Sequence, residues 1–364
     1  MSLYKIKDSV DLFLSNEKYL MVYFMNSRCR KSFRINHKMI HLLEKIDGRT
    51  DSETIKKIML QKYHVDPSET ENIFDVLKKN KIITEITNNQ NIISNDLYAR
   101  YDRQINYFSE FLDSEVDGII AQKKVFESHV FIFGCGAVGS GIAMELAMAG
   151  VGEFSLYDYD IIENADVSRH IFFKEEYIGM QKTHALAKEL KSINSAVKIH
   201  IYNESMTPTS DIDKIIKGCN FVVNTLDEPY IGYTAAKISR VCMKQRIAHY
   251  IAGGFDAHLS STGELIIPYI TPCVECYADH FKIALKDWKP KKHPVQIRYL
   301  EIGGLASLSL FSTSYACIEI LKYIAGLVEI EQSYKIRGEF LFHDMSLTYL
   351  NIKKNPLCPI CGKG

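Results

Sequence analysis

Two Cys-x-x-Cys pairs that lie far apart in the sequence most constrain how this chain folds. Cys273 and Cys276 lie in the segment TPCVEC, and Cys358 and Cys361 lie in NPLCPICGKG near the C-terminus. Each pair sits in a tight turn marked by proline or glycine, and four thiolates at this spacing are typical of a tetrahedral zinc site. We therefore predict a structural zinc ion that ties the C-terminus to residues 273–276.

The composition argues against several broad classes of protein. The 364 residues include 44 basic and 44 acidic side chains, so no net field favours nucleic acid or an anionic membrane. The N-terminus lacks the segments of a secretory signal, and no uncharged apolar run is long enough to span a bilayer. The five other cysteines are scattered, as in a reduced compartment. We therefore expect a cytoplasmic protein of more than one domain that binds neither nucleic acid nor membranes.

Residues 1–88 predict a small winged-helix-like α+β domain. The segments KYLMVYFMN and KSFRIN are predicted to form short strands around a polar turn. Apolar spacings of three and four indicate helices in HKMIHLLEKI, DSETIKKIMLQKYH and DPSETENIFDVLKKN, with Asp51 and Asp66 as N-caps. KIITEIT is predicted to close the domain as a strand.

This order of elements resembles the PqqD-like leader-recognition domain, which is found on enzymes that modify ribosomally made peptides. The resemblance implies that the domain binds a precursor peptide. We expect the peptide to add a strand to an exposed sheet edge near KYLMVYFMN. A domain that serves only packing or dimerisation is the alternative.

The sequence predicts a polar linker and a helical arm in residues 89–122. It predicts a Rossmann-like α/β domain in residues 123–364. In the α/β domain, the strand HVFIFG, a Gly-rich turn, the helix SGIAMELAMAG and the strand EFSLYDYD form one βαβ unit. Further strands are predicted in VKIHIYN, CNFVVNTLD, RIAHYIAGGF and GELIIPYI.

The Gly-rich turn predicts a nucleotide-binding site. Gly134, Gly136 and Gly139 form a G-x-G-x-x-G motif between a strand and a helix. Glycines let the backbone approach a phosphate, and the helix N-terminus offers free N–H groups. Asp158, at the end of the next strand, suits the ribose hydroxyls of either NAD or ATP. The motif by itself therefore leaves the nucleotide open.

Two cations beyond Asp158 favour ATP. Arg169 and Lys182 follow this acid closely in the sequence. Positive charges there suit a triphosphate under attack, because charge builds on the α-phosphate and on pyrophosphate. Hydride transfer to or from NAD has no such requirement.

A series of ordered motifs from about residue 98 to the C-terminus resembles the ThiF/MoeB-type adenylating enzymes, relatives of ubiquitin-activating enzymes. Asp158-Tyr159-Asp160 and Arg169 match the family's second motif, and the cysteine pairs match a zinc site that often occurs in it. The remaining matches are Arg100-Tyr101-Asp102-Arg103-Gln104, GCGAVG, Gly179-Met180-Gln181-Lys182, and Asp227 in NTLDEP.

This resemblance implies a site, a reaction and an assembly. A substrate carboxylate would attack the α-phosphate of ATP, giving an acyl-adenylate and pyrophosphate. The family's second arginine, here Arg103, reaches into the partner subunit's ATP site, which implies a homodimer. The implied ligands are Asp158 and Asp160 for the nucleotide, Arg103, Arg169 and Lys182 for the phosphates, and Asp227 for Mg²⁺, which neutralises the triphosphate.

Two residues depart from the family pattern. Asp166 stands where the family has Asn, and His170 stands where it has Gln. A carboxylate near the α-phosphate is electrostatically unhelpful, so we expect Asp166 either to turn away or to help bind metal.

The cysteines predict no thioester relay. Ubiquitin-type activators pass the acyl group to a cysteine beyond the first zinc knuckle, but no cysteine lies between Cys276 and Cys317. Cys317 belongs to an apolar helical pattern.

Without a relay, and with a PqqD-like domain, the chain resembles the MccB-type enzymes, which adenylate a ribosomal peptide on the way to microcin C-like antibiotics. Pantocin-type relatives activate Glu side chains, so a terminal and a side-chain carboxylate both stay open.

Three other functions are alternatives. Activators of the sulfur-carrier proteins of thiamine or molybdopterin synthesis belong to the same family, but they usually lack an N-domain of this kind. An NAD-dependent dehydrogenase would explain the glycines and Asp158, but not Arg169, Lys182 and the cysteine pairs together. The third alternative is a scaffold that presents a peptide and has no catalytic activity. The presence of the expected phosphate and Mg²⁺ ligands argues against it, and the departure of Asp166 from the family pattern argues slightly for it.

Overall fold

The computed structural model describes residues 2–15, 18–86, 92–112, 114–256, 259–287, 304–327, 337–350 and 352–362. The chain divides into two compact units, Met1–Lys123 and Lys124–Gly364. The helical arm expected within residues 89–122 therefore groups with the N-terminal unit. No helix among the described residues combines the length and the apolar composition needed to cross a membrane.

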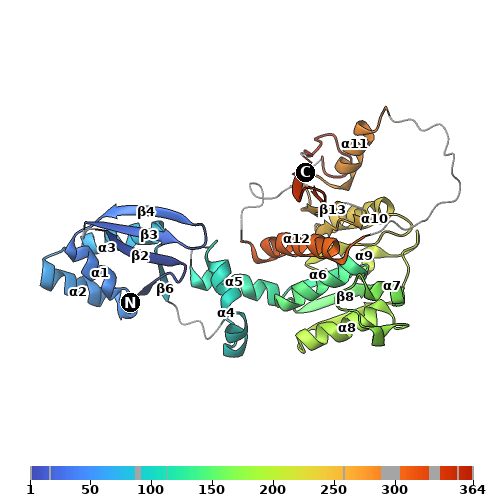
Figure 1. Cartoon of the computed structure of the whole chain (residues 1–364). Helices are drawn as coiled ribbons and strands as arrows, with labels where there is room; N and C mark the ends of the chain where they lie inside the picture. The colour runs from blue at the N-terminus through green and yellow to red at the C-terminus, as the bar shows by residue number, and fades with distance from the viewer. Residues whose placement is uncertain are drawn as a thin grey trace. The chain divides into compact units, whose positions relative to one another are not determined.

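The N-terminal unit begins with two antiparallel three-stranded sheets and three helices (Figure 1). One sheet has the order β5-β1-β6, from β1 (Leu3–Ile6), β5 (Asp47–Asp51) and β6 (Ile83–Ile86). The other has the order β2-β3-β4, from β2 (Val10–Ser15), β3 (Tyr19–Phe24) and β4 (Cys29–Arg34). The helices are α1 (His37–Lys45), α2 (Ser52–Tyr63) and α3 (Pro67–Lys79). The predicted α+β composition is confirmed, and the winged-helix-like interpretation stays a prediction.

Side-chain caps define where these helices begin. Asn36, Asp51 and Asp66 accept hydrogen bonds from backbone N–H groups in the first turns of α1, α2 and α3. Each such cap stabilises its helix by about 1 kcal/mol. The prediction of Asp51 and Asp66 as N-caps is confirmed.

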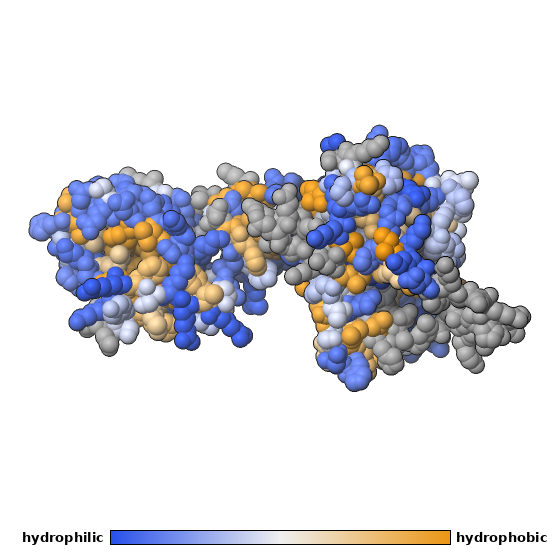
Figure 2. All heavy atoms as spheres, turned by 90° about the horizontal axis from the view of Figure 1, so that it is seen from above, coloured by the Kyte–Doolittle hydropathy of each residue, from blue (hydrophilic) through white to orange (hydrophobic). Residues whose placement is uncertain are grey.

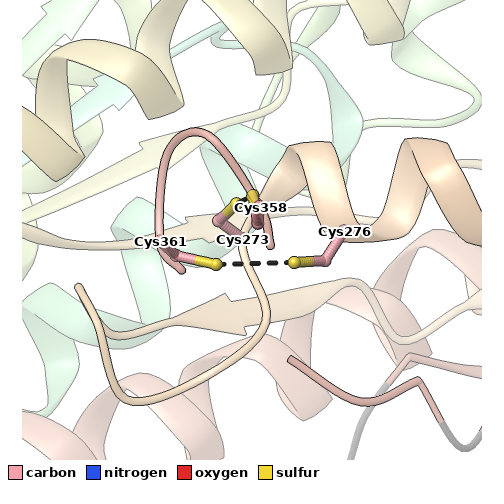
Figure 3. A group of neighbouring side chains, drawn as sticks. All are labelled: Cys273, Cys276, Cys358 and Cys361. Atoms are coloured by element: carbon pink, nitrogen blue, oxygen red, sulfur yellow. Dashed lines mark hydrogen bonds between the residues drawn. The ribbon is translucent and has the colours of Figure 1, made fainter. Parts of the chain in front are cut away.

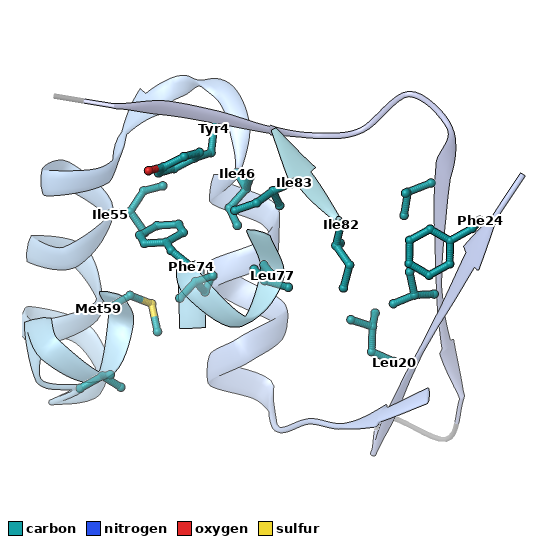
Figure 4. Close-up of a cluster of buried hydrophobic side chains, with 14 residues drawn as sticks. Tyr4, Leu20, Phe24, Ile46, Ile55, Met59, Phe74, Leu77, Ile82 and Ile83 are labelled. Carbon is teal, nitrogen blue, oxygen red and sulfur yellow. The ribbon is translucent and has the colours of Figure 1, made fainter. Parts of the chain in front are cut away.

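An apolar core joins the two sheets to the helices (Figure 4). Tyr4 from β1 and Phe74 from α3 pack with ring centroids 5.1 Å apart. Ile55 from α2 and Val22 from β3 are fully buried in the same cluster. Burying each large apolar side chain contributes about 1.5–3 kcal/mol, so this core is the main source of the unit's stability.

The structure corrects the predicted peptide-binding edge. β3, formed by the segment KYLMVYFMN, pairs with β2 on one side and with β4 on the other. Its backbone groups are therefore engaged, and it cannot accept a further strand. Within this sheet, as far as it is described, the edges are β2 and β4. The outer face exposes Phe13, Tyr19 and Met21, and Figure 2 shows hydrophobic surface among hydrophilic side chains on this unit.

Two further helices follow these sheets in the chain, α4 (Asn95–Ser109) and α5 (Glu115–Phe126). The end of α4 is held to the β2-β3-β4 region, because the Glu110 carboxylate accepts hydrogen bonds from Ser9 Oγ and Asn26 Nδ2. Lys7 Nζ also donates to the Ser109 carbonyl, at 3.5 Å. These contacts explain why the arm groups with the N-terminal unit.

The C-terminal unit is built on a six-stranded sheet in the order β14-β11-β10-β7-β8-β9. All neighbours are parallel except β14, which pairs antiparallel with β11. The predicted Rossmann-like topology is thus confirmed. The strands are β7 (His129–Phe133), β8 (Glu153–Tyr157), β9 (Lys198–Tyr202), β10 (Phe221–Asn224), β11 (Ala248–Ile251) and β14 (Glu264–Ile266). The helices are α6 (Ala137–Met148), α7 (Asn164–Val167), α8 (Lys182–Ile193), α9 (Ile212–Ile215), α10 (Ile231–Gln245), α11 (Val274–Ala284) and α12 (Ala306–Ala325), with a short 3₁₀ turn at Glu175–Tyr177.

A second, four-stranded sheet and the long helix α12 complete this unit (Figure 1). The sheet has the order β12-β13-β15-β16, from β12 (Phe255–Asp256), β13 (Leu259–Ser261), β15 (Gly338–Leu341) and β16 (Ser346–Tyr349). α12 packs closely against α6, since a Cβ added at Gly141 would lie 2.8 Å from Thr313 Cγ2. This packing holds α6, and with it the glycine loop, in place.

Candidate nucleotide site

A cavity of about 570 Å³ lies at the carboxyl ends of β7, β8 and β10. β7 and β10 are neighbours, and the strand order reverses between them. Open α/β sheets bind ligands at such a switch point. Seven residues assigned to the site from the sequence line this cavity, namely Gly134, Gly136, Asp158, Asp160, Arg169, Lys182 and Asp227.

The first two glycines leave room between β7 and α6. Gly134 has φ +90°, a conformation that favours glycine, and an added Cβ would lie 2.4 Å from Thr225 Oγ1. Gly136 is the N-cap of α6, and no side chain caps the helix there. Ala137 and Val138 of the first turn line the cavity. The uncapped N–H groups and the positive end of the helix dipole form a site suited to phosphate.

Gly139 serves packing rather than ligand contact. It is absent from the described residues that line the cavity. A Cβ added there would lie 2.0 Å from the Gly134 carbonyl oxygen and 2.7 Å from Thr225 Oγ1. A larger residue would push α6 away from β7, so the third glycine permits close packing of the helix on the strand.

Asp158 is fixed at the end of β8 by two backbone donors. Its Oδ2 accepts from Cys135 N at 2.7 Å, and its Oδ1 accepts from Asp160 N at 2.8 Å. Burial raises the pKa of Asp158, and the two backbone hydrogen bonds oppose this increase. The carboxylate is thus held in one orientation at the cavity wall, where hydroxyl groups of a ribose can donate to it.

Lys182, the first residue of α8, forms the main ion pair of the cavity. Its Nζ lies 2.9 Å from Asp160 Oδ2 and 3.8 Å from Asp166 Oδ2. Burial alone would lower the pKa of Lys182, but the hydrogen bond to Asp160 and the nearby carboxylates outweigh burial and raise it. The ammonium group is therefore charged at every physiological pH.

Asp166 does not turn away from the cavity. It lines the cavity and is buried. Its Oδ2 accepts from the Glu163 backbone N–H at 3.0 Å, which caps the short helix α7. Its Oδ1 lies 3.4 Å from Arg169 Nη2 and 3.6 Å from His170 Nδ1. Asp166 therefore holds the cations of the site, and Arg169 and Lys182 partly neutralise its charge.

His170 presents a neutral ring to the same cavity. Its Nδ1 donates to the Asp166 carbonyl oxygen at 2.7 Å. Burial lowers the pKa of His170 despite the opposing effect of Asp166. Because Nδ1 is used in this hydrogen bond, the neutral ring offers a ligand only the acceptor Nε2. The family's glutamine has an amide group, which contains both a donor and an acceptor.

Thr225, Tyr159 and Glu228 are among the cavity residues that were not assigned from the sequence. Thr225 Oγ1 donates to the carbonyl oxygens of Phe133 and Gly134, both at 3.0 Å, and so holds the glycine turn against β10. Tyr159 donates a hydrogen bond to Glu228, which joins the segments that follow β8 and β10. The carboxyl ends of neighbouring parallel strands share one edge of the sheet. This rule could have identified these residues from the sequence.

Arg103 lies in the other unit. It is exposed on α4 of the N-terminal unit, while all described residues of the cavity belong to the C-terminal unit. Arg103 is therefore not among the described residues that line the cavity, and its role as a phosphate ligand stays a prediction.

The four paired cysteines come together, as predicted (Figure 3). Cys273 and Cys276 lie at the start of α11, and Cys358 and Cys361 lie in the C-terminal loop. The Sγ atoms of Cys273 and Cys358 are 3.5 Å apart, and those of Cys276 and Cys361 are 3.4 Å apart. A disulfide would require about 2.05 Å, so these are free thiols.

This cysteine group fits a tetrahedral metal ion. All four side chains are buried, and their sulfur atoms lie within 4.8 Å of one another. Burial raises the pKa of Cys361 to about 11, and a coordinated cation would reverse this effect, since a coordinating thiol is deprotonated. Four thiolates leave no open position, which is typical of structural zinc sites.

The remaining cysteines agree with the expectation of no relay. Of the nine cysteines, only Cys29, on β4, is exposed. Cys317 is buried on α12, and its Sγ lies 3.6 Å from the Ile142 carbonyl oxygen. Burial raises the pKa of Cys317 far above the ordinary thiol value, so it is a poor nucleophile.

Solved structures with the same fold cover the whole chain. The crystal structure of E. coli MccB with ATP has a TM-score of 0.72 at 20% identity and covers 100% of both chains. The microcin C7 biosynthetic enzyme MccB in complex with N-formylated MccA has a TM-score of 0.71 at 19% identity, again covering 100% of both chains.

Comparison with curated sequences identifies the family. The chain is 23% identical over 328 residues to the adenylyltransferase and sulfurtransferase UBA4 of Lodderomyces elongisporus. The match covers 88% of this chain and 66% of UBA4, so the chain spans just under two thirds of the length of that relative. The profile of the ThiF family matches residues 101–360. The chain therefore belongs to the ThiF family, as its ordered motifs predicted.

Proposed function

We propose that this protein is an ATP-dependent adenylyltransferase that activates a carboxylate as an acyl-adenylate. One observation carries the proposal. The switch-point cavity combines the uncapped N-terminus of α6, the fixed Asp158 carboxylate and the paired cations Arg169 and Lys182. These groups match the phosphates and the ribose of ATP, and a hydride-transfer site has no use for the two cations.

The negative charge of the cavity indicates that ATP binds there together with Mg²⁺. Five carboxylates line it, those of Asp158, Asp160, Asp166, Asp227 and Glu228, against the two cations Arg169 and Lys182. A triphosphate would add further negative charge, so its binding requires a divalent cation. We assign Mg²⁺ to Asp227, which is exposed directly after β10 at the cavity.

We propose a ribosomally made precursor peptide as the substrate, in a microcin C-like or pantocin-like pathway. The MccB structures, one of them in complex with MccA, match this chain over its full length, including the N-terminal unit. A PqqD-like role for that unit would let the peptide add to β2 or β4. Activation of a sulfur-carrier protein is the second candidate, because the curated relatives are named adenylyltransferase and sulfurtransferase.

We also propose one structural zinc ion at Cys273, Cys276, Cys358 and Cys361. Unpaired thiols of this kind persist in a reducing compartment, which supports a cytoplasmic location.

ATP–pyrophosphate exchange tests the proposed reaction. We expect exchange that requires Mg²⁺ and a short peptide encoded beside the gene, together with binding of ATP but not of NAD. Exchange supported only by a Gly-Gly-ending carrier protein would select the second candidate. ATP binding without exchange for either substrate would indicate the scaffold, and binding of NAD alone would overturn the proposal.

Arg103 supplies a test of the homodimer. We propose that it completes the phosphate site of a partner subunit, so two-fold symmetry creates two shared sites. Mixing inactive Arg103→Ala and Lys182→Ala subunits should then restore part of the activity, because one site of the mixed dimer carries neither substitution. Absence of recovery, with subunit exchange verified by mass spectrometry, would argue against a shared site.

A further inference from the structure

Three neighbouring strands of the parallel sheet each carry one metal-binding side chain toward their amino ends. In the order β7-β8-β9, the three residues are His129, Glu153 and His200. His129 and Glu153 begin their strands, His200 is the third residue of β9, and Cys219 lies nearby, two residues before β10. The nucleotide cavity lies at the carboxyl ends, so this group is separate from the proposed active site.

The donor atoms of these three residues lie close together. The ligand atoms of His129, Glu153 and His200 lie within 4.8 Å of one another, and His129 Nδ1 lies 3.7 Å from Glu153 Oε1. Cys219 Sγ lies 3.6 and 3.8 Å from the two ring nitrogens of His129, so it packs against the ring and does not belong to the group of donors. Donor atoms around a tetrahedral zinc ion are about 3.4–3.8 Å apart, given metal–ligand distances of about 2.0–2.3 Å. His200 Nε2, at 2.8 Å from Glu153 Oε1, is the one donor that must move outward.

The surroundings of His129 orient it for such a role. Its Nε2 lies 2.9 Å from the hydroxyl of Ser155, a buried residue of β8. With the Nε2 proton donated to Ser155, the lone pair on Nδ1 is free to bind a metal ion beside Glu153. Two hydrogen bonds between the backbone of His129 and Asn220 hold the Cys219 turn beside the ring. Metal-binding histidines usually have their other nitrogen fixed in this way.

We propose that His129, Glu153 and His200 bind a divalent transition metal of the zinc type. Two imidazoles and a carboxylate suit zinc and not the oxygen-preferring Mg²⁺, and three protein ligands leave the fourth position of a tetrahedral ion to water. Binding replaces the hydrogen bond between His200 Nε2 and Glu153 by two metal–ligand bonds, and a neutral His200 then carries its proton on Nδ1. His200 is exposed, so the metal enters from the His200 side.

The metal would act as a clamp on the sheet. It would join three adjacent strands, β7, β8 and β9, which are otherwise connected by backbone hydrogen bonds, by packing and by the side-chain contacts of His129 with Ser155 and of His200 with Glu153. Because it lies at the opposite edge from the nucleotide, we expect it to raise stability without taking part in adenylation. The proposal is independent of the proposed reaction.

Cobalt substitution distinguishes this site from the four-cysteine group. The full-length protein, stripped of metal and titrated with Co²⁺, should show two sets of visible bands. Four-thiolate cobalt gives intense bands at long wavelength, and a site of imidazole and carboxylate ligands gives weaker bands at shorter wavelength. His200→Ala should remove only the second set and lower zinc content by about one ion per chain. His184→Ala, which removes an exposed histidine from α8, is the matched control and should change neither.

Ser155→Ala provides a second test that keeps all three donors. Losing the partner of His129 should weaken zinc binding at this site about 10–100-fold, as for other groups that orient a metal ligand. A single set of four-thiolate bands in the parent protein would overturn the proposal, as would identical zinc content in the parent and His200→Ala proteins.

Discussion

Replacement of Lys182 by alanine is expected to lower the kcat/KM of peptide-dependent ATP–pyrophosphate exchange by about a hundredfold or more. A hundredfold loss is equivalent to about 2.7 kcal/mol of transition-state stabilisation. Lys182 Nζ is the cation that faces both Asp160 and Asp166, at 2.9 and 3.8 Å. Removing it leaves two carboxylates beside the triphosphate without their shared partner. Repulsion then opposes both nucleotide binding and the build-up of charge on pyrophosphate.

A matched substitution on the same helix separates chemistry from helix stability. Lys188 is exposed on α8, and its Nζ lies over the Tyr177 ring rather than in the cavity. Lys188→Ala should leave exchange within about twofold of the parent, since surface substitutions usually have small effects. Equal activity of the Lys182→Ala and Lys188→Ala proteins, at matched melting temperatures, would remove Lys182 from the site.

The pH dependence of this reaction gives a further check on Lys182. Its pKa is raised above the ordinary lysine value of 10.5, so its charge is lost only as the pH rises through that higher pKa. Loss of activity between pH 7 and 9 would therefore have to come from another group. The Lys182→Arg protein, which keeps the charge, should retain the parent's alkaline profile.

Much of this site could be predicted because parallel strands converge at their carboxyl ends. Gly134, Asp158 and Asp227 each follow a buried apolar strand, so identifying the strands was enough to bring the three residues together. The cysteine pairs were predictable for a similar reason, since their spacing fixes the ligand geometry locally. Both predictions depend on short segments whose conformation is set by neighbouring residues.

Features that depend on contacts between distant segments were not predictable in the same way. The motif spacing did not reveal that Gly139 faces the Gly134 carbonyl and Thr225 rather than the cavity. Alternation within KYLMVYFMN indicated a strand, but not that β3 would pair on both sides. The single-residue ligands of the proposed metal clamp come from three strands, and no local spacing connects them.

Replacement of Cys361 by serine is expected to remove one zinc ion per chain and to lower the melting temperature by roughly 6–12 °C. This is the shift for about 3 kcal/mol in a unit of 241 residues, 124–364. The four cysteines connect the start of α11 to the C-terminal loop, and structural zinc adds its binding free energy to folding (Figure 3). The remaining three buried thiols bind zinc poorly, because each must then be deprotonated with one ligand missing.

A second cysteine and a chelator complete this test. Cys242 is equally buried, on α10 and outside the cysteine group, so Cys242→Ala should keep the full zinc content while losing only the packing of one thiol. A strong zinc chelator should lower the melting temperature of the parent protein by at least as much as Cys361→Ser does. In the Cys361→Ser protein, the same chelator should have a smaller effect, because the four-thiolate ion is already absent and only the ion proposed at His129, Glu153 and His200 is left to remove. Full zinc content in Cys361→Ser, or a chelator effect as large as in the parent, would show that these four thiols hold no structural metal and that packing alone joins the C-terminus to α11.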